Sequence, residues 1–127
     1  MNRMPCDRGS VDGMAVPEQE LKFIEQVLSH FCASRVPDHA KHQVELLYRK
    51  RGNALTLIER RPYFRDPSVH TETPIARFRY LAKESCWALD WMDRNERWHP
   101  YTGFEQERHF LRLLQEVASD PTGIFWG

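Results

Sequence analysis

Apolar and polar side chains alternate along residues 74–101, and this stretch predicts the centre of the fold. Strict alternation is typical of a strand with one buried face. Two clusters of turn-forming residues, at 82–85 and 93–96, divide the stretch into three strands. We therefore predict a three-stranded antiparallel meander.

Tight turns determine which residues face one another across this meander, because side chains alternate between its two faces. A tight turn at 82–85 pairs Arg77 with Asp90, and a tight turn at 93–96 pairs Asp90 with His99. The face predicted to be core carries Phe78, Tyr80, Trp87, Leu89, Trp91 and Trp98. The face predicted to be open carries Arg77, Arg79, Cys86, Asp90, Arg97, His99 and Tyr101.

Two other segments have apolar residues at helical spacing. The first runs from Pro17 to about Ser34, with acidic residues in its first turn that favour the helix macrodipole. The second begins at Thr102, which we interpret as the N-cap of a capping box, and runs to about Ala118. After it, residues 124–126 are apolar enough that we expect them to pack on the domain.

Two further strands, residues 43–50 and 54–60, flank a Gly52-Asn53 turn, which predicts a cross-strand ion pair between Glu45 and Arg60. Residues 61–73 contain two prolines and are followed by a third, so we predict a loop there rather than a strand. A loop of this length is either a functional segment or a crossover, and its two aromatic residues agree with both.

Together these elements predict an α+β domain. Its five-stranded antiparallel sheet consists of two blocks, one hairpin and one meander, and the N-terminal and C-terminal helices cover one face. We expect residues 1–16 to be a flexible leader and residues 17–127 to be a single domain.

The chain has 127 residues, with 18 lysines and arginines against 18 acidic residues, so its formal net charge is zero. This balance argues against a protein that coats nucleic acid in general. Residues 41–101 nevertheless carry 12 basic and 8 acidic residues, which makes the predicted sheet region basic.

Three cysteines, Cys6, Cys32 and Cys86, show neither a CxxC motif nor the Cys/His spacing of a metal site. Their odd number is typical of free thiols in a reducing compartment. No run is apolar enough to span a bilayer, and the N-terminus lacks the apolar core of a signal peptide. We therefore expect a cytoplasmic protein with no metal, no cofactor and no membrane contact.

Five segments carry a resemblance to a known family: FCASRVP (31–37), GNALTLIERRP (52–62), IARFRY (75–80), WALDWMDRNERWHPY (87–101) and LLQEVASDPTGIFWG (113–127). Together they resemble the bacterial family catalogued as domain of unknown function 3024, over residues 20–127. The resemblance implies a single cytoplasmic domain from a bacterium. It implies no substrate, no cofactor and no catalytic residue.

The predicted row of Arg77, Asp90 and His99 is the candidate catalytic cluster. A carboxylate that orients an imidazole is half of a general-base device. The same row is also the kind of opposite-charge pairing that stabilises strand register. The row lacks a nucleophile, because Cys86 lies about 13 Å from Asp90 along the strand. Tyr101 is placed to act as an acid or a substrate anchor, and we assign no catalytic residue.

A binding surface is the other interpretation of the same face, formed by Arg77, Arg79, Arg97, His99 and Tyr101. A basic and partly aromatic sheet surface binds either protein or single-stranded nucleic acid. We favour a binding or interaction module of this kind. The alternative is a small hydrolase or nuclease-like enzyme that uses the candidate catalytic cluster. A cleft beside the row would favour the enzyme, and a flat positive face would favour binding.

Overall fold

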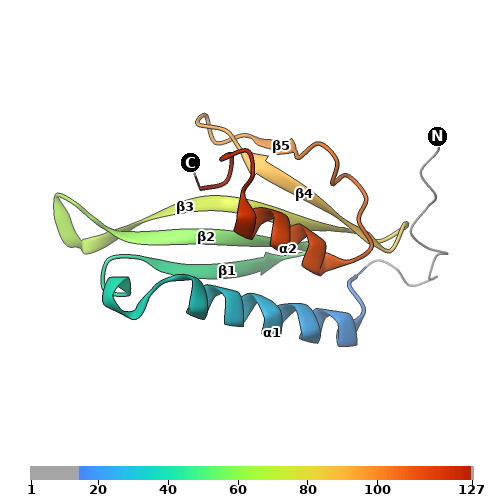
Figure 1. The fold of residues 1–127 in the computed structure, drawn as a ribbon, viewed down its shortest axis with the longest axis horizontal. Helices are drawn as coiled ribbons and strands as arrows, with labels where there is room; N and C mark the ends of the chain where they lie inside the picture. The colour runs from blue at the N-terminus through green and yellow to red at the C-terminus, as the bar shows by residue number, and fades with distance from the viewer. Residues whose placement is uncertain (1–14, 127) are drawn as a thin grey trace.

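The computed structural model describes residues 15–126, which form two α-helices and one five-stranded antiparallel sheet (Figure 1). In chain order the elements are α1 (Glu18–Arg35), a short 3₁₀ helix (Asp38–Ala40), β1 (Glu45–Arg51), β2 (Ala54–Tyr63), β3 (Asp66–Leu81), β4 (Cys86–Met92), β5 (Trp98–Pro100) and α2 (Phe110–Ser119). The predicted α+β class is confirmed. Most of the predicted leader, residues 1–14, lies outside the described residues.

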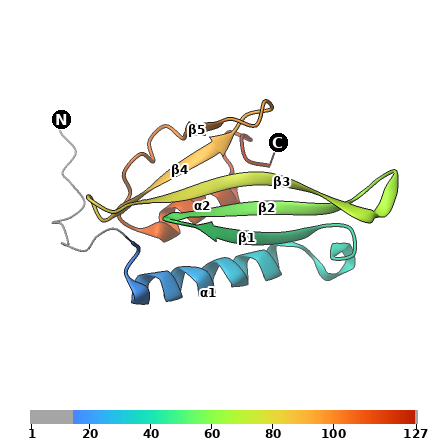
Figure 2. The ribbon, with the colours of Figure 1, turned by 180° about the vertical axis from the view of Figure 1, so that it is seen from behind.

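The strand order is β1-β2-β3-β4-β5, so the two predicted blocks join into one continuous meander. Both helices cover the same face, because Ile24 and Leu28 of α1 belong to one buried cluster with Leu113 and Val117 of α2. Figures 1 and 2 show the two faces: α2 lies in front of the sheet in Figure 1 and behind it in Figure 2. In both views α1 runs along the β1 side of the sheet.

Aromatic residues form the centre of this core. Trp87 and Phe78 are completely buried, and both rings contact Phe110 of α2, with centroid distances of 5.2 and 5.0 Å. Tyr80 lies 5.1 Å from Trp87 on the same face. The indole Nε1 of Trp87 donates a hydrogen bond of 3.1 Å to Glu20 in α1. The strand pattern therefore supplies the surface on which both helices pack.

The register of the β1–β2 and β3–β4 pairs is the one predicted from the sequence. Arg77 lies opposite Asp90 between β3 and β4, as predicted. The β1–β2 hairpin turns at residues 52–53 and places Glu45 opposite Arg60, also as predicted. These two hairpins have the short turns that the sequence indicates, so turn length and side-chain alternation together determine their register.

The predicted loop at residues 61–73 is wrong. These residues extend β2 and β3 into a two-stranded ribbon that projects past β1 (Figure 1), with Tyr63 opposite Asp66 at its end. A two-stranded ribbon tolerates proline, because each strand has a free side on which a missing N–H breaks no ladder bond. The prolines also coincide with irregular pairing: Pro62 and Pro74 lie at the two register shifts between the strands.

The predicted capping box at Thr102 is also wrong, because α2 begins at Phe110. Residues 101–109 instead follow the outer side of β4. The backbones of Trp87 and Glu107 exchange two N–H···O hydrogen bonds of 2.7 Å. Pairing with β4 satisfies backbone groups that a short β5 leaves without a partner, and a longer helix would not do so.

The turn between β4 and β5 is longer by one residue than predicted. Asp93 and Arg97 close it through an N–H···O hydrogen bond of 2.9 Å, so residues 94–96 form a three-residue loop. Glu96 has a left-handed backbone conformation, with φ of 63°. A type I turn followed by one left-handed residue is a common three-residue hairpin loop. It shifts the register of β5 by one.

The C-terminal residues pack on the domain, as predicted. Asp120 ends α2 in a left-handed conformation, and its carboxylate accepts the backbone N–H groups of Phe125 and Trp126 at 3.1 and 2.8 Å. The indole of Trp126 donates to the carbonyl of Val117 at 2.7 Å. Phe125 is buried against Tyr101, with a centroid distance of 5.1 Å.

Candidate functional site

The longer second turn reverses the face of every β5 side chain. Trp91 pairs with His99 rather than with Trp98, so His99 lies on the helix-covered side and Trp98 lies on the open face. Tyr101 is buried on the helix side, where its hydroxyl donates to Glu116 of α2 at 2.7 Å. The predicted row of three residues is therefore not formed, and the predicted burial of Trp98 in the core is wrong.

The open sheet face retains two of the three predicted partners. Asp90 is only 1 % exposed, and it accepts from Arg77 Nε at 2.8 Å and from Arg79 Nε and Nη2 at 2.5 and 3.0 Å. The guanidinium carbon of Arg77 lies 4.8 Å from the ring centroid of Trp98. We call these four residues the arginine cluster. Two cations share one buried carboxylate, so the cluster carries one net positive charge.

The other charged residues of the open face are mostly paired. Arg49 forms a bidentate pair with Glu72, with both distances 2.6 Å, and this pair lowers the pKa of Glu72. Arg60 lies 3.6 Å from Glu45, as predicted. The predicted binding residue Arg97 is exposed, but it lies in the turn before β5. The open face is therefore not uniformly positive.

His99 has a different carboxylate partner from the one predicted. Its Nε2 lies 2.6 Å from Asp93 Oδ2, and this hydrogen bond, together with two backbone N–H bonds, lowers the pKa of Asp93. Its ring stacks on Trp91. Within the described residues Asp93 is the one hydrogen-bond partner of the His99 side chain. The imidazole therefore has no serine or cysteine to activate there.

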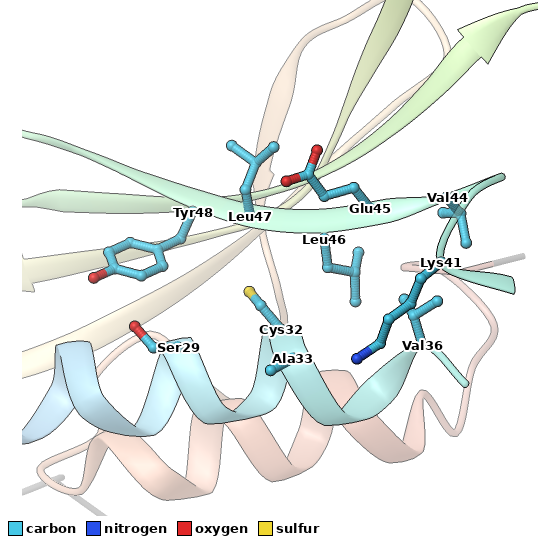
Figure 3. A pocket seen from close by; sticks show the side chains of 10 residues that line it. All are labelled: Ser29, Cys32, Ala33, Val36, Lys41, Val44, Glu45, Leu46, Leu47 and Tyr48. Carbon is cyan, nitrogen blue, oxygen red and sulfur yellow. The ribbon is translucent and has the colours of Figure 1, made fainter. Parts of the chain in front are cut away.

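A groove that the sequence does not indicate lies between α1 and β1, with a volume of about 550 Å³ (Figure 3). Most of the residues that line it are apolar or small and come from α1, β1 and the positions next to them: Ser29, Cys32, Ala33, Val36, Val44, Leu46, Leu47 and Tyr48. The side chains of Leu46 and Cys32 point toward one another across it (Figure 3). The one sequence feature related to the groove is the small size of Ser29 and Ala33, because their side chains leave space beside the edge strand.

Polar groups of the groove lie mainly at its ends. The hydroxyl of Tyr48 donates to Glu25 at 2.7 Å, and Lys41 Nζ lies 3.2 Å from the exposed Asp38. The thiol of Cys32 is free, and burial raises its pKa to about 11. A thiol with such a pKa stays protonated at neutral pH and is a poor nucleophile. The groove is therefore suited to apolar contact rather than to covalent chemistry.

The end of the β2–β3 ribbon exposes aromatic surface. Phe64 is 81 % exposed, and its ring contacts Tyr63 at a centroid distance of 5.1 Å. The guanidinium of Arg65 lies 5.3 Å from the centroid of Phe64. This segment is the one predicted to be functional or a crossover, and the structure makes it a projecting ribbon.

Three further features concern metal binding, membrane-spanning helices and the state of the cysteines. Residues 15–126 contain no group of three or more potential ligands placed to hold a metal ion. No helix among them has the length and apolar character needed to cross a membrane. Cys86 is disulfide-bonded, which contradicts the expectation of free thiols at that position. Cys6 lies outside the described residues.

Comparison with known proteins identifies the family without adding an activity. A family model described as domain of unknown function (DUF3024) matches residues 16–127, nearly the whole chain. The chain matches none of the curated proteins and none of the solved structures with which it was compared. The predicted resemblance is confirmed, and the chain belongs to the DUF3024 family.

Proposed function

We propose that this domain is a binding module for other proteins and that the groove between α1 and β1 is its main binding site. One observation carries the proposal: an apolar groove of about 550 Å³ runs beside an edge strand. Contiguous apolar surface that is rimmed by polar groups marks protein-interaction sites and binding grooves. The groove has this composition, and edge strands readily pair with further chains.

The enzyme alternative loses the arrangement on which it depended. Its cluster required Arg77, Asp90 and His99 in one row, and His99 lies on the opposite face from Asp90. The His99 imidazole that contacts Asp93 instead forms no hydrogen bond with a serine, threonine or cysteine side chain among the described residues. The binding module therefore agrees better with the geometry.

The open sheet face is a second candidate surface, and the arginine cluster favours it. Trp98 joins Arg77 and Arg79 on this face in place of His99 and Tyr101. Arginine guanidinium groups bind carboxylate and phosphate groups, and an indole adds a stacking surface. We propose that this face contacts an acidic group, either of a protein partner or of single-stranded nucleic acid.

A pair of helix variants tests the main site. Ala33→Trp places a large ring in the groove, whereas Ser34→Trp adds the same ring at the next exposed helix position, which does not line the groove. Immobilised full chain is incubated with a lysate of its native cells, and retained proteins are identified by mass spectrometry. We expect wild type and Ser34→Trp to retain proteins that Ala33→Trp does not. Equal retention by all three proteins would refute the groove as the binding site.

A fluorescence titration tests the open face. Tryptophan emission is followed as a short oligothymidine or a glutamate-rich peptide is added at low and at physiological salt, with Trp98→Phe as the control that identifies the contribution of Trp98. We expect quenching that depends on salt and is absent in the control. No change with either probe at low salt would exclude the face as an anion-binding surface.

A further inference from the structure

β1 is an edge strand, and half of its backbone groups face the groove side. Arg51 and Ala54 flank a two-residue turn, and in such a hairpin the flanking residues exchange hydrogen bonds. Alternation then directs the N–H groups of Leu46, Tyr48 and Lys50 away from β2. Among residues 15–126, none accepts a hydrogen bond from them. β1 also pairs with β2 without a bulge, so its edge is regular.

An added strand would place side chains over the groove. Leu46 and Tyr48 point toward α1, whereas Glu45 and Leu47 point to the opposite side of β1 (Figure 3). A strand paired with this edge has the same alternation, so every second side chain points toward α1. Those side chains lie about 7 Å apart, and the apolar walls favour apolar residues there.

Lysines lie at both ends of the same edge, and Glu45, which also lines the groove, is paired with Arg60. Lys41 lines the groove at one end, and its one carboxylate contact among the described residues is the fully exposed Asp38. Exposed ion pairs of this kind are weak, so Lys41 can exchange partners at little cost. Lys50 and Arg51 lie at the other end of β1 and are exposed. The two ends of β1, a strand of seven residues, are about 20 Å apart.

We propose that the groove binds an extended segment of another protein, which adds to β1 as a sixth strand. The segment carries apolar residues at two alternate positions, and acidic residues before and after them. Backbone hydrogen bonds to the β1 edge hold the segment, the groove selects its apolar residues, and the lysines at the two ends select its charge. This inference rests on the proposed function, because it specifies the partner of the same groove.

Selection from a library of random linear peptides displayed on phage tests the inference. Peptides are selected on the wild-type full chain and depleted on Ala33→Trp. We expect enriched sequences with apolar residues at positions i and i+2 between Asp or Glu residues. Enrichment of apolar residues at i, i+3 and i+4 would indicate a helical partner and would refute an added strand, and so would a failure to enrich any peptide.

Amide hydrogen exchange on the complex with the most enriched peptide then tests strand addition directly. We expect exchange at the Leu46 and Tyr48 amides to slow by about tenfold or more, because both become hydrogen-bonded. Unchanged exchange at these amides in a saturated complex would refute the added strand. Concentration-dependent dimerisation that Ala33→Trp abolishes would also refute it, because the occupant would then be a second copy of this chain.

Charge variants test the selection of acidic residues. Lys50→Glu should weaken binding of the enriched peptide by roughly fivefold, as expected for one exposed ion pair replaced by repulsion. Lys83→Glu makes the same change in the turn before β4 and should leave the affinity unchanged. Equal affinity of the two variants would refute the charge requirement. Loss of lysate capture in Ala33→Trp without any extended peptide ligand would leave the binding module standing and refute only the added strand.

Discussion

Trp91 stacks on His99, with ring centroids 4.7 Å apart and ring planes inclined by 27°. This contact follows from the register of β5, in which the two residues are direct partners between β4 and β5. It places His99 beside Asp93 rather than beside Asp90. One additional residue in a hairpin loop therefore separates the two charged clusters that a tighter turn would have merged.

The register predicts different costs for two tryptophan truncations. Trp87→Ala should lower the free energy of unfolding by about 3–5 kcal/mol, because it empties a fully buried site. Trp98→Ala should cost only about 1 kcal/mol, because that ring is half-buried on the open face and its main contact is with Arg77. Urea unfolding of both variants measures the difference, and equal costs would contradict the assignment of faces.

The buried carboxylate of the arginine cluster should matter more than an exposed one. Asp90→Asn should cost about 3 kcal/mol of stability, because it leaves two guanidinium groups without their counter-charge. Partial exposure of Arg79 keeps this figure at the low end of the range. Glu72→Gln, which breaks the exposed pair with Arg49, should lower stability far less than Asp90→Asn does. Chemical denaturation measures the free energy of unfolding of both variants. A larger loss in Glu72→Gln than in Asp90→Asn would contradict the expectation.

Asp93 should titrate below its ordinary value of 3.8, mainly because of its hydrogen bond with His99. A lowered pKa in the folded state means that this contact stabilises the fold above pH 3.8. The stabilisation is lost as the pH falls through the lower, folded-state pKa. Carboxyl carbon NMR measures the midpoint, and His99→Leu, which has no hydrogen-bond donor, should raise it toward the ordinary value. An unchanged midpoint in His99→Leu would show that the hydrogen bond does not form in solution.

The C-terminal residues should contribute to stability. Deleting residues 123–127 should lower the free energy of unfolding by about 3 kcal/mol and lower the Tm, because Phe125 is buried and Trp126 is half-buried. Phe64→Ala at the end of the β2–β3 ribbon is the control, since its ring is exposed and its loss should change stability by about 0.5 kcal/mol or less. Thermal unfolding measures the Tm of both variants. A truncated chain with the same Tm as Phe64→Ala would contradict packing of the C-terminal residues.

Cys32 should react slowly with alkylating reagents. Its pKa of about 11 leaves little thiolate at pH 8, so iodoacetamide should modify it far more slowly in the folded protein than in urea, where the pKa returns to about 9.0. Mass spectrometry of the peptide that contains Cys32 gives the rate. The folded-state rate should keep rising up to about pH 11. A plateau near pH 9 would show that the thiol is not buried as described.

Side-chain alternation in the sequence was enough to predict much of the fold. It separates the two faces of β1 to β4, and the contacts of Trp87, Phe78 and Phe110 follow from burial of one face. Helical spacing locates α1 to within about a residue at each end, because one apolar stripe packs on the sheet. These features depend on local periodicity and on the burial of apolar surface, and both can be inferred from the sequence alone.

Only the tertiary structure decided the elements that matter for the candidate sites. The left-handed conformation of Glu96 sets the register of β5, and no apolar pattern indicates it. Backbone groups of β4 attract residues 101–109, although their side chains predict a helix. The groove exists because the small side chains of Ser29 and Ala33 leave a gap between α1 and an edge strand. Loop conformation, backbone pairing and the separation of packed elements arise from contacts between distant residues, and local periodicity does not encode them.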